Sequence, residues 1–177
     1  ITVSDPVEQV RDLLKEKDVH VTEDNLAAIA QADIVVFAVK PQVLAQVLRP
    51  LYGQFDDKLV ISIVAGAEIA TISELLGTER VVRVMPNTPA LVQTGAHGLY
   101  ATEQVNSTDR ELASQVLAAT GLTIWVNSEA QIDAVTAVSG SGPAYFFYLM
   151  ESMIRAGKNL GLDEKVATAL TLQTALG

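Results

Sequence analysis

The sequence predicts a doubly wound α/β domain with a mostly parallel sheet, followed by an all-α segment. Short β-branched runs alternate with helical stretches of roughly ten residues, which is the pattern that βαβ units produce. Several runs are apolar at nearly every position, as in strands that helices cover on both faces. After about residue 127 the β-branched runs stop and only helical patterns follow. We therefore expect two domains, over 1–127 and 128–177.

The first half supplies strands and connecting helices in turn. In chain order, strands are expected over 1–4, around His20, and over 34–39, 59–64 and 81–85. Helices are expected after Asp5-Pro6, where apolar residues recur with a helical period, and over 43–52 and 69–76. Thr71 and Glu74 have the spacing of a capping box, which predicts that they open the last of these helices.

The second half predicts three helices, over 133–138, 143–160 and 164–176, the last capped by Asp163. The segment 144–150 is apolar or aromatic on every helical face. A helix of that kind must be covered on all sides. A small domain covers it most easily with a second subunit, so we expect a homodimer or a higher homo-oligomer.

The composition argues against several classes of partner and site. The formal net charge is −9 and the isoelectric point about 4.6, which argues against nucleic acid or an anionic membrane as a partner. The chain has no Cys and two widely separated His, so a metal site is not expected. No run suits a membrane span or a secretory signal, which predicts a cytoplasmic protein. Because the first residue is Ile1 within a β-branched run, we expect a segment of a longer protein.

Candidate chemistry lies where three predicted strands end. The sequences there are Lys40-Pro41, Ala65-Gly66 and the run 86–89 (Pro-Asn-Thr-Pro). Ligands of open α/β sheets bind beyond the carboxyl ends of strands, although Pro, Gly and Asn are also the ordinary residues of turns. A further run, 139–142 (Ser-Gly-Ser-Gly), precedes the aromatic helix. It could bind an anion, but a plain Ser cap with Gly for close helix packing is the favoured interpretation.

Four motifs together resemble the pyrroline-5-carboxylate reductase family. They are 38–42 (Ala-Val-Lys-Pro-Gln), 61–66 (Ile-Ser-Ile-Val-Ala-Gly), 83–90 (Arg-Val-Met-Pro-Asn-Thr-Pro-Ala) and 132–145, which contains Ser-Gly-Ser-Gly-Pro. The resemblance covers essentially the whole chain. It implies a Rossmann-type dinucleotide-binding domain, an all-α dimerisation domain, and reduction of the C=N bond of 1-pyrroline-5-carboxylate to L-proline with NADPH or NADH.

The resemblance also implies site residues. The positions that match cofactor-binding segments are Ser4, Asp5, Asn25, Ala38, Val39, Lys40, Pro41, Ile63, Val64, Ala65, Met85 and Asn87. Glu129 matches a position that contacts bound proline, although a solvated loop carboxylate would otherwise be the better interpretation. The family's Gly-rich first turn and its substrate-carboxylate loop have no counterpart in these residues. No side chain is expected to act as a general acid, His20 and His97 included.

Two questions stay open at this level. Asp5 would hydrogen-bond a ribose 2′-OH and repel a 2′-phosphate, but its loop is partly open, so we expect use of both cofactors with NADPH accepted.

The competing interpretations are a β-hydroxyacid dehydrogenase and a non-catalytic nucleotide-binding dimer. The dehydrogenase would need a buried catalytic Lys in residues 128–177, the helical half of the chain. Lys158 and Lys165 lie there, but neither has an apolar motif around it.

Overall fold

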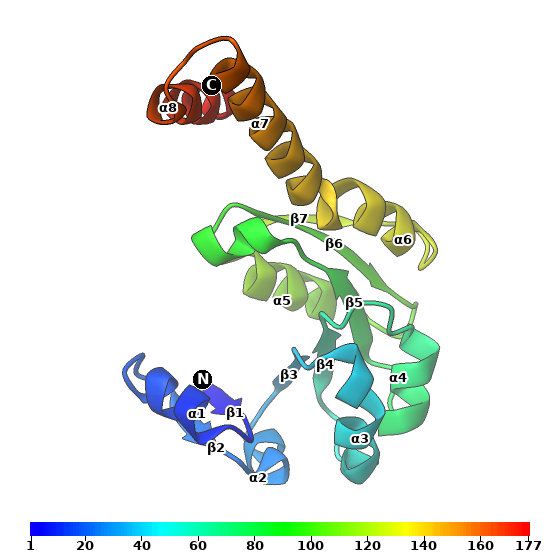
Figure 1. Ribbon diagram of the computed structural model, residues 1–177. Helices are drawn as coiled ribbons and strands as arrows, with labels where there is room; N and C mark the ends of the chain where they lie inside the picture. The colour runs from blue at the N-terminus through cyan, green and yellow to red at the C-terminus, as the bar shows by residue number, and fades with distance from the viewer.

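The computed structural model describes residues 1–177 as an α/β body from which a pair of helices projects (Figure 1). The strands are β1 (Thr2–Ser4), β2 (His20–Thr22), β3 (Ile34–Phe37), β4 (Leu59–Ser62), β5 (Val81–Met85), β6 (Gly95–Ala101) and β7 (Gly121–Trp125). The α-helices are α1 (Glu8–Lys15), α2 (Asn25–Ala30), α3 (Leu44–Leu48), α4 (Ile69–Leu76), α5 (Ser107–Ala118), α6 (Gln131–Val135), α7 (Gly142–Asn159) and α8 (Glu164–Leu176). Short 3₁₀ turns occupy Pro41–Val43, Arg49–Leu51 and Thr88–Val92, and a π-helical turn covers Thr136–Gly140.

The sheet is mostly parallel, which confirms the predicted fold class. β1 and β2 pair in parallel as a small separate sheet, and the main sheet has the order β3-β4-β5-β6-β7. Within it only the β5–β6 pair is antiparallel. The connection from β5 to β6 holds only a 3₁₀ turn, which is too short for the crossover that parallel strands need. The helix α5 supplies such a crossover between β6 and β7, and that pair is parallel again.

Two apolar cores lie on the two faces of the main sheet. Neighbouring residues of β5 divide between them, since Val81 belongs to the cluster that contains Leu48 and Ile72, and Val82 to the cluster that contains Ala113. Successive side chains of a strand point to opposite faces, so helices must cover both. All five of these side chains are 0% exposed, which fixes α3 and α4 on one face and α5 on the other.

One predicted cap is wrong. Residue Glu68 precedes α4 in an extended conformation and its side chain makes no capping bond, so Thr71 lies inside the first turn instead of opening the helix. The Ile69 N–H donates 2.8 Å to Oε1 of Glu129, which lies 60 positions further along the chain. A remote carboxylate therefore satisfies the helix start that the local motif was expected to satisfy.

The predicted helix over 133–138 also differs from the structure. Helix α6 ends at Val135, and the chain continues as a π-helical turn in which the Ser141 N–H donates 2.8 Å to the carbonyl of Thr136. Ser141 makes no side-chain capping bond to α7, so the favoured Ser cap is wrong. By contrast, Asp163 caps α8 as predicted, with its Oδ1 accepting 2.8 Å from the N–H of Lys165.

Helix α7 leaves the sheet (Figure 1), and its aromatic side chains are exposed. Phe146 is 67% exposed and Tyr148 is 69% exposed. The helix packs against α8 near its far end but against little else. The aromatic surface is thus left uncovered by this chain. No helix combines the length and apolarity that crossing a membrane requires.

His97 is a buried histidine with a fixed tautomer. It is 2% exposed, and its Nε2 lies 3.0 Å from the Thr120 hydroxyl. That hydroxyl donates its proton 3.0 Å to the carbonyl of Leu117, so it accepts from Nε2–H. Nδ1 then carries a buried lone pair without a partner. Burial lowers the pKa of His97 below its ordinary value of 6.5, and hydrogen bonding to the backbone of Thr120 opposes that only in part.

We expect the free energy of unfolding to fall as the pH drops through about 6.5, because the unfolded state then binds a proton that buried His97 resists. The loss amounts to at most about 1.4 kcal/mol per pH unit, and it stops growing once His97 is protonated in the folded protein. Urea unfolding of the full-length protein between pH 7.5 and 5.5 measures it. The His97→Gln variant should lose this pH-dependent fall in the free energy of unfolding. The His20→Gln variant, changed at an exposed position, should keep it. Equal pH dependence in His97→Gln and the parent would contradict the assignment.

Candidate functional site

Three of the predicted loops meet at one edge of the main sheet. β3, β4 and β5 are neighbouring parallel strands, with Phe37 in register with Ser62, and Ser62 in register with Arg83. The chain segments that follow, 38–41, 63–66 and 86–89, therefore leave the sheet at the same carboxyl edge. The Ile63 N–H donates 3.1 Å to the carbonyl of Phe37, so the first two segments start side by side.

The surface of this edge is built from small and backbone groups. Ala38, Lys40 and Ala65 are exposed, while Val64 is buried beneath them. Gly66 has a φ of +73°, and a Cβ placed on it would meet nothing within 4 Å. The conformation, and not crowding, therefore requires glycine at this turn. Such an edge fits a flat ligand that approaches the backbone closely, with Lys40 as the nearby cation.

The residues predicted for the adenosine end form a second group. Ser4 donates 2.7 Å from its hydroxyl to Oδ1 of Asn25, which joins the end of β1 to the start of α2. Asp5 Oδ1 accepts 2.8 Å from the N–H of Val7 at the start of α1. Its carbonyl accepts 2.7 Å from Arg11. One oxygen of the Asp5 carboxylate is thus occupied by the chain, and a guanidinium lies beside the same turn.

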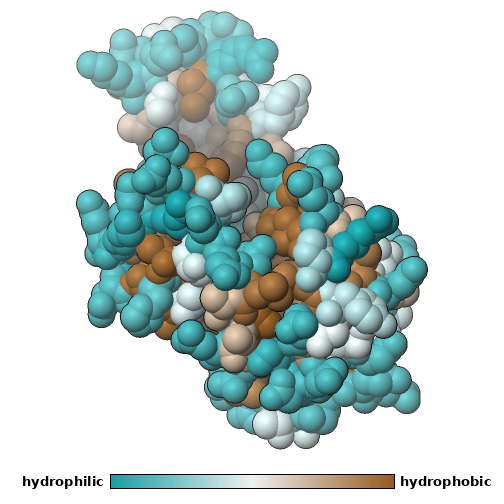
Figure 2. Space-filling model, turned by 90° about the horizontal axis from the view of Figure 1, so that it is seen from below, coloured by the Kyte–Doolittle hydropathy of each residue, from teal (hydrophilic) through white to brown (hydrophobic).

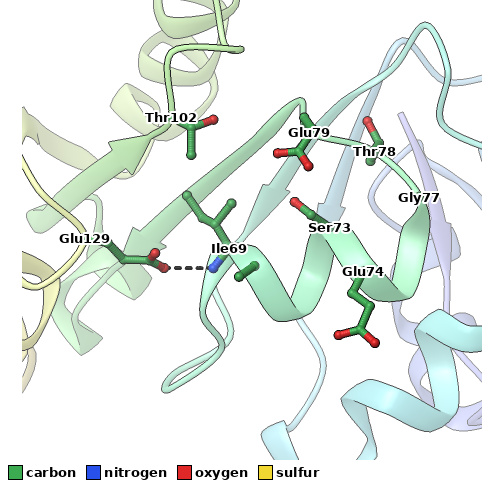
Figure 3. Close-up of a pocket in the computed structure, with 9 residues that line it drawn as sticks. Ile69, Ser73, Glu74, Gly77, Thr78, Glu79, Thr102 and Glu129 are labelled. Carbon is green, nitrogen blue, oxygen red and sulfur yellow. Dashed lines mark hydrogen bonds between the residues drawn. The ribbon is translucent and has the colours of Figure 1, made fainter.

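Glu129 joins three parts of the fold. Its Oε1 accepts 2.8 Å from the Ile69 N–H (Figure 3) and 3.0 Å from Nη1 of Arg83. Arg83 is 6% exposed in the middle of β5, and its Nη2 lies 3.7 Å from Asp133. A buried guanidinium is costly unless it is paired, so Glu129 stabilises β5 as well as α4. The Glu129 side chain remains 28% exposed, with Oε2 free of these bonds.

Sequence reasoning missed Arg83 as a residue of the site. The signal was available, because a single Arg interrupts an otherwise apolar strand in 81–85. A charge in such a strand must find a partner, which marks Arg83 as a residue to examine.

A cavity of about 460 Å³ runs beside α4 from Glu129 toward the amino end of β5 (Figure 3). Its lining residues are Ile69, Ala70, Ser73, Glu74, Gly77, Thr78, Glu79, Thr102 and Glu129. Since Gly77–Glu79 precede β5, most of this cavity lies away from the carboxyl edge where the loops meet. No group of three or more His, Cys, Asp or Glu side chains is arranged to hold a metal ion.

The last two predicted cofactor residues face the helical half. Asn87 donates 3.1 Å from Nδ2 to the carbonyl of Ser139 and accepts 2.9 Å at Oδ1 from the Ala96 N–H. Met85 lies against Gly140, where an added Cβ would be 2.7 Å from its Cε. Both side chains are therefore engaged inside the protein, and a cofactor contact from Asn87 would have to come from its backbone.

Comparisons with known proteins agree on one family. A family model described as pyrroline-5-carboxylate reductase dimerisation matches residues 129–177, and one described as NADP oxidoreductase, coenzyme F420-dependent, matches residues 1–66. Pyrroline-5-carboxylate reductases from Pseudomonas aeruginosa and Haemophilus influenzae are 51% and 45% identical over 100% of this chain. The chain spans 66% of the length of each of them.

Solved structures give the same result. A pyrroline-5-carboxylate reductase structure from Coxiella burnetii has a TM-score of 0.95 and 43% identity, covering 100% of this chain and 67% of that one. The Plasmodium falciparum pyrroline carboxylate reductase with NADP bound has a TM-score of 0.81 and 36% identity, covering 88% of this chain and 60% of that one. A prephenate dehydrogenase from Aquifex aeolicus, at 16% identity and a TM-score of 0.63, shares the fold alone. By sequence and by structure, this chain belongs to the pyrroline-5-carboxylate reductase family.

Proposed function

We propose that the protein reduces the C=N bond of 1-pyrroline-5-carboxylate to give L-proline, with hydride from NADPH or NADH. The observation that carries this proposal is the shared carboxyl edge of β3, β4 and β5, where 38–41, 63–66 and 86–89 converge. The family relatives support the substrate and the reaction. A cytoplasmic location stays a prediction.

The nicotinamide cofactor supplies a hydride, and the chain's residues supply its surroundings. Ala38 and Ala65 have short side chains, so a flat ring can lie close to the backbone there. Val64 is buried beneath them and makes that surface apolar. The hydride adds to C5 of the pyrroline ring, whose nitrogen must carry a proton because an iminium accepts hydride far better than a neutral imine. The product is a secondary amine. The second oxygen of Glu129 is the group that we propose contacts the substrate, near the ring nitrogen.

The direct test is reduction by the full-length protein. We expect loss of NADPH absorbance that depends on 1-pyrroline-5-carboxylate, with proline formed in equal amount. Prephenate and a β-hydroxy acid with NAD⁺ serve as controls for the rival dehydrogenase. Turnover of either control without reduction of 1-pyrroline-5-carboxylate would overturn the proposal, and a protein that binds NADPH but turns over nothing would favour the non-catalytic alternative.

The helical half offers no catalytic Lys for the rival dehydrogenase. Nζ of Lys158 lies 2.7 Å from a carboxylate oxygen of Glu164, near the end of α7 that is remote from the sheet. Lys165 is exposed in the first turn of α8. Both residues are exposed, so neither ammonium lies in an apolar pocket.

We also propose that another parallel strand fits between β1 and β3. β1 pairs only with β2, and β3 pairs only with β4, so each has one open edge. Val36 in β3 is 45% exposed, and apolar surface gathers in the middle of the lower face, bordered by hydrophilic residues (Figure 2). In a doubly wound sheet the strand at this place carries the Gly-rich turn for the pyrophosphate. That strand would bring Ser4 and Asn25 into line with the carboxyl edge.

The turn after β1 bears on the choice of cofactor. Asp5 is half-buried and one of its carboxylate oxygens accepts from the N–H of Val7, just before α1, while Arg11 lies beside the turn. We propose that both cofactors are used, with Asp5 penalising the 2′-phosphate. Charges of about −2 and −1 placed roughly 6 Å apart in water repel by about 1.4 kcal/mol.

Replacing Asp5 by Asn should therefore raise kcat/KM with NADPH about tenfold and change kcat/KM with NADH much less. Asn keeps an oxygen for the N–H of Val7, so the turn before α1 keeps this bond. Glu16→Gln, the same loss of charge at the far end of α1, is the matched control and should leave the ratio within about twofold. An unchanged NADPH to NADH ratio in Asp5→Asn would show that Asp5 does not face the 2′ position.

We propose further that a second copy of the chain covers α7 and completes a homodimer. The helix exposes Tyr145, Phe146, Phe147, Tyr148 and Leu149, all more than half exposed. A continuous aromatic patch of this kind marks an interface. The match of 129–177 to a dimerisation domain supports a copy of the same chain as the partner. Helix α6 would stay with the sheet and α7 and α8 with the partner, so the division would fall after α6 and not at the predicted boundary of 127–128.

The Phe146→Asp variant should shift the full-length protein from dimer to monomer by at least a hundredfold in Kd, because it places a charge in the middle of the apolar patch. Sedimentation equilibrium measures the shift. Gln115→Glu on exposed α5 adds a charge elsewhere and should leave the assembly unchanged. A dimer of unaltered stability in Phe146→Asp would place the interface on another surface.

A further inference from the structure

The strand β5 and the loop after it hold the helical half by a row of alternate residues. Arg83, Met85 and Asn87 are spaced by two, so they extend on one side of the strand. Each of them contacts the segment 129–140: Arg83 pairs with Glu129, Met85 lies against Gly140, and Asn87 bonds to Ser139. The last of these lies at the carboxyl edge where the cofactor segments converge.

The bond from Asn87 has a specific cause in the sequence. In a regular helix the carbonyl of Ser139 would accept from the N–H of residue 143. That residue is Pro143, which has no N–H to donate. Nδ2 of Asn87 donates to this carbonyl instead, at 3.1 Å. A side chain from the cofactor edge thus takes the place of a backbone bond in the helical half.

The Asn87 amide also bonds to the start of β6. Oδ1 of Asn87 accepts 2.9 Å from the N–H of Ala96, at the start of β6. With Nδ2 on Ser139 and Oδ1 on Ala96, both ends of the amide are occupied and its orientation is fixed. The side chain therefore joins the end of β5, the start of β6 and the π-helical turn at a single point.

We propose that Asn87 is a positioning residue: it sets where α7 begins relative to the cofactor edge, and so where the helical half is held against bound substrate. The inference rests on the proposed reductase function. The π-helical turn 136–140 is the element it acts through, since a π-helical turn is a local departure from the helix and such turns concentrate at functional sites. The nucleotide segments 38–41 and 63–66 lie on other strands, so cofactor binding should not depend on the bond.

The test compares Asn87→Asp and Asn87→Ala with Asn106→Asp in the full-length protein. Asp at position 87 keeps the acceptor for the Ala96 N–H but loses the donor to Ser139, and Ala loses both without adding a charge. Asn106 caps α5 through an acceptor bond alone, to the N–H of Asp109, so Asn106→Asp is the matched change at an unrelated helix.

We expect both Asn87 variants to raise KM for 1-pyrroline-5-carboxylate at least tenfold, with Kd for NADPH and the values for Asn106→Asp within twofold of the parent. A residue that served stability alone would lower the active fraction and hence kcat, and would leave KM unchanged. Hydrogen exchange of the peptide that covers 136–142, measured without ligands, should be at least tenfold faster in the Asn87 variants.

The outcomes separate this inference from the proposed function. If the parent protein does not reduce 1-pyrroline-5-carboxylate, the proposed function fails, and the exchange measurement still tests the bond. If the parent is active and either KM or the exchange rate is unchanged in both variants, the positioning role is overturned. If Asn87→Asp does not fold, Asn87→Ala carries the same comparison.

Discussion

The parallel alignment of β3, β4 and β5 is the constraint on which the site depends. Parallel neighbours end on one edge only when a crossover returns the chain to the same side after each strand. Here α3 and α4 are those crossovers, and their buried residues, among them Leu48 and Ile72, hold them to the sheet at 0% exposure. The apolar core is therefore what brings together loops that are about 25 residues apart in sequence.

The reversal at β6 has a structural consequence for the other half of the molecule. Because β6 returns antiparallel to β5, its Gly98 lies beside Met85, and a Cβ on Gly98 would be 2.6 Å from Val135. The absence of a side chain there lets α6 lie close on the sheet. That closeness allows the buried Arg83 to reach Glu129, so the ion pair follows from the packing.

The sequence predicted the elements well where the signal was local. The apolar runs gave β5 and the helices α4 and α8 with their observed bounds, and Asp163 was identified as a cap because its partner is two residues away. The cap of α4 was mispredicted because Glu129, from the far half of the chain, accepts from the Ile69 N–H. The π-helical turn had no local signal. The family motifs predicted which loops form the site, but they did not predict that the Asn87 side chain donates to the carbonyl of Ser139.

The positions of the two halves thus depend on bonds that cross between them. Helix α7 is held at its start by the contacts of Asn87 and Met85 with 139–140, and its aromatic middle is uncovered by the sheet. The far end of α7 packs against α8, so the two helices extend from the sheet together. The start of this helix pair and the carboxyl edge of the sheet are therefore coupled through the same few contacts.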